Sequence, residues 1–100
     1  EASSPLKALL HTYDKSKGLG AANRGRHTDA EVDTIIQKAL ATVDSDARGK
    51  LLAAATEKAV GENYGVIPLH YQVNTWAAKA GYKYLPRTDE RTIVMGLSAN

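Results

Sequence analysis

The sequence predicts an α+β fold with three helices, two of them joined as an antiparallel helical hairpin, followed by a few short β-strands. Two helical patterns of apolar residues, at 28–43 and from 44 to about 61, are separated by almost no connecting sequence, which favours a hairpin. Downstream, residues 67–73 alternate apolar and polar side chains, as a strand with one buried face does. The length of 100 residues predicts one domain, 1–100.

The first helix is expected from about Ser4 to Tyr13. Ser3 or Ser4 can cap it, and Pro5 suits its first turn because the N–H that proline lacks is not needed there. One apolar stripe at helical spacing supports this assignment: Leu6, Leu9, Leu10 and Tyr13.

Residues 15–26 are expected to form a loop, because they contain three glycines and show no apolar period. Loops carry function more often than helices do. Asn23 and Arg24 are therefore candidate ligand-binding residues. The alternative is an asparagine that fixes the loop and an arginine on the surface.

The second and third helices have the clearest start signals. Thr28 and Glu31 form a capping-box pattern, and Asp44 or Ser45 can cap the next helix, which is expected to end near Gly61. The second helix has a long apolar stripe: Val32, Ile35, Ile36, Ala39, Leu40 and Val43.

The strand predicted at 67–73 has an apolar face of Ile67, Leu69, Tyr71 and Val73, and a polar face that includes His70 and Gln72. We take His70 and Gln72 as further candidate ligand-binding residues, with a solvent-facing strand as the alternative. A short extended piece is expected at 82–85 and a last strand at 92–97. A lone tryptophan, Trp76, is expected to pack in a core rather than to line a pocket.

Composition excludes several classes of function. A net charge of +2, spread along the chain, gives no basic stripe for nucleic acid. Cysteine is absent, and no catalytic or phosphate-binding motif occurs, so we expect no enzyme, no cofactor and no metal site. His11 and His27 are expected at the surface.

Four motifs in order carry a resemblance to a known family: Asn23, Glu31-Val32-Asp33, Asp44–Arg48 and the run Ile-Pro-Leu-His-Tyr-Gln-Val-Asn-Thr-Trp at 67–76. Together they resemble the C-terminal segment of the extracellular solute-binding proteins of ABC transporters, family 5, the peptide and nickel type. The chain departs from that pattern at residues 27–30, where the family commonly has Tyr-Ser-Asn-Pro.

The resemblance implies a fragment of one lobe of a two-lobed periplasmic-binding-protein fold, with the acidic anchor for a peptide's amino terminus upstream. It implies binding of peptides or related small solutes, delivery to the transmembrane permease subunits of an ABC importer, and a periplasmic or extracytoplasmic location, free or membrane-anchored. In such receptors the residue before the Val-Asn pair, here Gln72, lines the solute pocket.

A second class of function remains open. The chain could be a small helical protein–protein interaction module with no solute-binding role, and exposed strand edges could make it self-associate. Its size at several concentrations would distinguish this module from a monomer.

Overall fold

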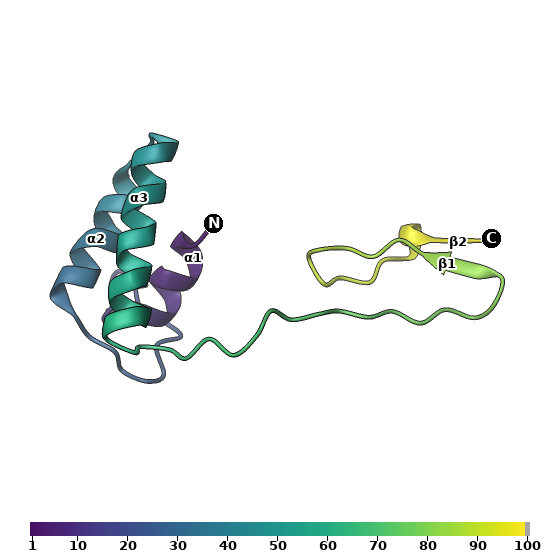
Figure 1. The fold of residues 1–100 in the computed structure, drawn as a ribbon, viewed down its shortest axis with the longest axis horizontal. Helices are drawn as coiled ribbons and strands as arrows, with labels where there is room; N and C mark the ends of the chain where they lie inside the picture. The colour runs from purple at the N-terminus through teal and green to yellow at the C-terminus, as the bar shows by residue number, and fades with distance from the viewer. Residues whose placement is uncertain (100) are drawn as a thin grey trace. The chain divides into compact units, whose positions relative to one another are not determined.

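The structure, a computed structural model, describes residues 1–99. It consists of two compact units, Glu1–Pro68 and Leu69–Asn100. Unit 1 holds the main helices, including the packed pair α2 and α3, and unit 2 holds a two-stranded antiparallel sheet (Figure 1). The predicted α+β class with a helical hairpin is confirmed at this level.

The first helical segment is shorter than predicted. It begins as α1 (Ser3–Pro5), continues as a π-helical segment η1 (Leu6–Leu10), and ends before His11, whose backbone is extended at φ −67° and ψ 142°. The Asp33 carboxylate accepts a bond from the N–H of Thr12 at 2.9 Å. This long-range bond holds the backbone out of the helix, so the predicted end at Tyr13 was wrong.

Helix α2 (Ala30–Ala41) begins one residue later than the predicted capping box requires. Its N-cap is Asp29, whose Oδ1 accepts from the backbone N–H of Glu31 at 2.8 Å and of Val32 at 3.1 Å. The Thr28 hydroxyl instead pairs with the Thr12 hydroxyl at 2.8 Å. The capping-box prediction was therefore wrong about the residue, because the carboxylate satisfies two of the free N–H groups at once.

Helix α3 (Ser45–Thr56) is capped by Asp44, as predicted, through a 2.8 Å bond from the N–H of Ala47. It continues as a second π-helical segment, η2 (Glu57–Glu62), which ends near the predicted Gly61. Only three residues separate α2 from α3, and the two helices pack against each other in the core of unit 1.

The core of unit 1 lies between α2, α3 and the N-terminal helical segment. Val32 and Ile36 are its largest fully buried side chains, and alanines on α2 and α3 let the backbones approach closely. Val43, predicted in the same stripe, is 96% exposed because α2 has already ended at Ala41. The core members are Leu6, Leu10, Val32, Ile36, Ala39, Leu52, Ala55 and Ala59.

Residues 67–79 form neither helix nor strand in the structure. The predicted strand at 67–73 is thus not observed, since a strand requires the backbone hydrogen bonds of a neighbour and the segment has none among residues 1–99. Its alternate apolar side chains lie open to solvent: Ile67 at 77%, Leu69 at 84%, Tyr71 at 98% and Val73 at 83%.

Unit 2 is organised by β1 (Tyr82–Tyr84) and β2 (Leu97–Ala99), which pair antiparallel with Tyr84 opposite Leu97. The extended piece expected at 82–85 is confirmed in β1. The last strand begins later than expected, because Val94–Gly96 form a 3₁₀ turn, η3. No described residue of unit 2 is buried. No helix within residues 1–99 has the length and apolar character needed to cross a bilayer.

Candidate functional site

Asn23 is 4% exposed, and its amide is occupied by the backbone of unit 1. Its Nδ2 donates to the carbonyl of His11 at 3.0 Å and to the carbonyl of His27 at 2.7 Å, while its Oδ1 accepts from the N–H of His27 at 2.9 Å. Both amide protons and one oxygen lone pair are thereby used. This geometry is that of an asparagine that fixes a loop, and the neighbouring Arg24 is exposed.

His11 was predicted at the surface, but the structure buries it at 4% exposed. Its Nδ1 lies 2.7 Å from the carbonyl oxygen of Thr12 and 3.4 Å from Oδ1 of Asp33, and its Nε2 lies 3.0 Å from Nε2 of Gln37. An imidazole that donates from Nδ1 to the carbonyl and accepts at Nε2 satisfies all these contacts. His11 therefore joins the N-terminal segment to α2, which the sequence could not reveal, since its partners on α2, Asp33 and Gln37, lie more than 20 residues away.

His27, also expected at the surface, is half-buried. Its Nδ1 lies 2.7 Å from the carbonyl oxygen of Leu10, and its ring packs where a Cβ at Gly65 would come within 2.9 Å of it. Nearby, Nδ2 of Asn63 donates to the second carboxylate oxygen of Asp29 at 2.7 Å. These bonds hold the loop of residues 23–29 against the end of η2.

Hydrogen bonds favour the charged form of the Asp29 carboxyl group. Chiefly the Asn63 amide, and then the backbone N–H groups at the start of α2, hold the pKa of Asp29 below its usual value. In unit 2, the Arg87 guanidinium in the same way lowers the pKa of Asp89. Asp29 is half-buried and Asp89 is exposed, and both pKa shifts have local hydrogen-bonded causes.

Gln72 and His70 lie in the extended segment and are exposed. Gln72 donates from Nε2 to Oδ1 of Asn74 at 2.9 Å, which leaves its Oε1 open to a ligand. These two candidates belong to unit 2, whereas Asn23 and Arg24 belong to unit 1. Within each unit, the two candidates are near each other only because they are close in the sequence, and not because the fold brings them together.

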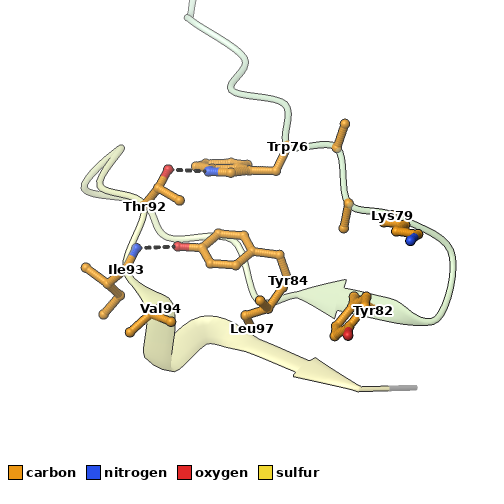
Figure 2. A pocket seen from close by; sticks show the side chains of 10 residues that line it. Trp76, Lys79, Tyr82, Tyr84, Thr92, Ile93, Val94 and Leu97 are labelled. Atoms are coloured by element: carbon orange, nitrogen blue, oxygen red, sulfur yellow. Dashed lines mark hydrogen bonds between the residues drawn. The ribbon is translucent and has the colours of Figure 1, made fainter.

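A cavity of about 460 Å³ lies within unit 2 (Figure 2). Its walls come from the segment before β1, from β1 itself and from the residues that lead into β2. Trp76 is half-buried and lines this cavity, so the prediction that it packs in a core was wrong. The lining side chains include Trp76, Lys79, Tyr82, Tyr84, Thr92 and Leu97.

The polar tips of the two central rings are held by the loop before η3. Trp76 donates from Nε1 to the Thr92 hydroxyl at 3.0 Å, and the Tyr84 hydroxyl accepts from the N–H of Ile93 at 3.1 Å (Figure 2). The Tyr84 hydroxyl also donates to the carbonyl of Arg91 at 3.3 Å. The ring centroids of Trp76 and Tyr84 are 5.8 Å apart, at an interplanar angle of 35°. The rings therefore present faces and edges, not polar groups, to the cavity.

Sequence reasoning missed this cavity. The available signal was Trp76 followed by Tyr82 and Tyr84, two residues apart and thus on one face of a strand. What the sequence did not show is the pairing of Tyr84 with Leu97, or Gly96, where a Cβ would lie 2.7 Å from the Tyr84 ring.

Within residues 1–99 no group of three or more histidine or carboxylate side chains is placed to hold a metal ion. The described geometry offers hydrogen-bonded structural contacts in unit 1 and an apolar recess in unit 2. Comparisons of this chain with protein-family models, with curated proteins and with solved structures found no match.

Proposed function

We propose that this chain is the C-terminal segment of the extracytoplasmic solute-binding receptor of an ABC importer, of the type that carries peptides and related small solutes. In the intact receptor the role is binding without catalysis: a solute enters between two lobes, the lobes close, and the permease recognises the closed form. Closure is driven by contacts that exist only in the closed state.

One observation carries the proposal: the apolar face of residues 67–73 is exposed in the structure. Four large apolar side chains at alternate positions are each more than three-quarters exposed. Such a pattern is typical of a strand that buries one face in a sheet, yet residues 1–99 supply no partner for it. A receptor lobe in which this segment returns to a large sheet accounts for the pattern.

The first experiment is the mass of the native product, by immunoblot against this chain followed by mass spectrometry of the purified band. We expect a mass several times the 10.7 kDa of this chain, with an exported N-terminus and a co-purifying solute. A band near 10.7 kDa would overturn the proposal and favour the interaction module instead.

The second experiment tests the solute pocket. Gln72→Ala in the intact receptor should weaken peptide binding about three- to tenfold, because one amide hydrogen bond to the solute is lost, without lowering the melting temperature. Lys50→Ala, an exposed change on α3, is the matched control. Calorimetry that finds equal affinity for both variants would remove Gln72 from the pocket.

A further inference from the structure

The cavity of unit 2 has the form of a small-ligand site. At about 460 Å³ it falls within the 300–1,000 Å³ typical of such sites, and its walls are mainly aromatic and aliphatic. None of residues 69–99 is buried. A ligand that covers the Trp76 and Tyr84 rings would therefore bury apolar surface that unit 2 leaves partly exposed to water.

The rings are held in position before any ligand arrives. Trp76 donates a hydrogen bond to Thr92, and the Tyr84 hydroxyl accepts from the N–H of Ile93 and donates to the carbonyl of Arg91, so both ring tips are fixed. Gly81, at φ +92°, allows the turn closed by the 3.0 Å bond from the N–H of Tyr82 to the carbonyl of Lys79. Preorganised walls reduce the entropic cost of binding.

The charge around the cavity is positive. Unit 2 carries four Lys and Arg side chains and two acidic ones, so the formal +2 of the chain resides in this unit. Arg87 is paired with Asp89, whereas Lys79, which lines the cavity, pairs with no carboxylate within residues 1–99. Figure 2 shows Lys79 beside Tyr82, at the end of the cavity away from Thr92. Among residues 1–99, no acidic side chain lines the cavity.

We propose that this cavity binds a small carboxylate with an apolar body, whose body lies against Trp76, Tyr84 and Leu97 and whose carboxylate pairs with Lys79. Apolar walls select the body, and the ammonium group of Lys79, the one lysine among the described residues that line the cavity, selects the charge. The site does not depend on the proposed receptor role, because every group in it lies within unit 2.

The test uses the whole 100-residue chain with phenylacetate as the probe. Trp76 is the only tryptophan, so its fluorescence reports on the cavity directly. Phenylacetamide has the same body without the charge, and acetate has the charge without the body. We expect a saturable change with phenylacetate, a Kd in the millimolar range or tighter, binding of the amide about two- to fivefold weaker, and no response to acetate.

Two matched lysine variants test whether Lys79 is the group that pairs with the carboxylate of the ligand. Lys79→Gln should abolish the preference for phenylacetate over phenylacetamide and leave binding of the amide unchanged. Lys83→Gln, on β1 and outside the cavity, should retain the preference. Amide signals in an NMR titration should shift for residues 76–97 and not for residues of α2 or α3.

Several results would overturn the proposal. These are a Trp76 emission that does not saturate with phenylacetate, equal affinity of the unaltered chain for phenylacetate and phenylacetamide, and equal loss of the preference in both lysine variants. NMR shifts confined to unit 1 would likewise place the binding elsewhere.

Discussion

Replacement of Asn23 by alanine removes three hydrogen bonds that hold two loop segments of unit 1 together. The carbonyls of His11 and His27 lose their donor, and the N–H of His27 loses its acceptor. A buried polar group left without a partner costs about 1 to 3 kcal/mol. Because His27 is only half-buried, water can reach part of this network, and we expect a total loss of about 3 kcal/mol.

Urea unfolding followed by far-ultraviolet circular dichroism measures this loss, because the long helices of the described chain all lie in unit 1. Arg24→Ala, at the adjacent exposed position, is the control and should change stability by less than about 0.5 kcal/mol. Asn23→Asp keeps the acceptor but places a carboxylate oxygen beside two carbonyls, so near pH 7 it should destabilise at least as much as alanine. Equal stability of Asn23→Ala and Arg24→Ala would refute the structural role of Asn23.

Three further predictions concern unit 1, each measured by urea unfolding. Ile36→Ala should cost about 2 to 5 kcal/mol, whereas Val43→Ala, at a 96% exposed position, should cost almost nothing; similar losses would mean that α2 buries another face. Gly20→Ala should cost about 1 to 3 kcal/mol more than Gly18→Ala, because both have positive φ but only a Cβ at Gly20 would strike backbone atoms; equal costs would contradict this. Since folding lowers the pKa of Asp29, its stabilisation is complete above its unfolded pKa of about 3.9 and is lost as the pH falls through the lower folded value. Asp29→Asn, which still caps, should reduce the loss of stability between about pH 7 and pH 3, and an unchanged loss would count against this linkage.

The sequence predicted those parts of the fold that depend on near neighbours. The α2 stripe through Val32 and Ile36 repeats at helical spacing, and Asp44 caps α3 through an N–H three residues away. Predictions of this kind hold because a helix satisfies its backbone within a few residues. The helix ends were less certain, since bonds from distant groups such as Asp33 decided where the first helix stops.

For the candidate ligand-binding residues, the sequence alone showed the residue type and position but not the groups that surround each side chain. Asn23 reads as a polar loop residue, and only the folded chain shows its amide satisfied by the backbone at residues 11 and 27. The burial of His11 could likewise not be predicted from the sequence, because it depends on contacts with residues that are remote in the sequence.

Sequence by itself therefore determined the helical periodicity, the α3 cap, the extended character of residues 82–84 and the alternation at 67–73. Tertiary structure decided that Asp29 rather than Thr28 caps α2, that residues 67–73 have no strand partner within residues 1–99, and that Trp76 and Tyr84 line a cavity. The physical reason is the distance along the sequence between the residues that interact. Periodicity and capping are satisfied within a turn or two of chain, whereas burial, strand pairing and cavity walls require segments that meet only after folding.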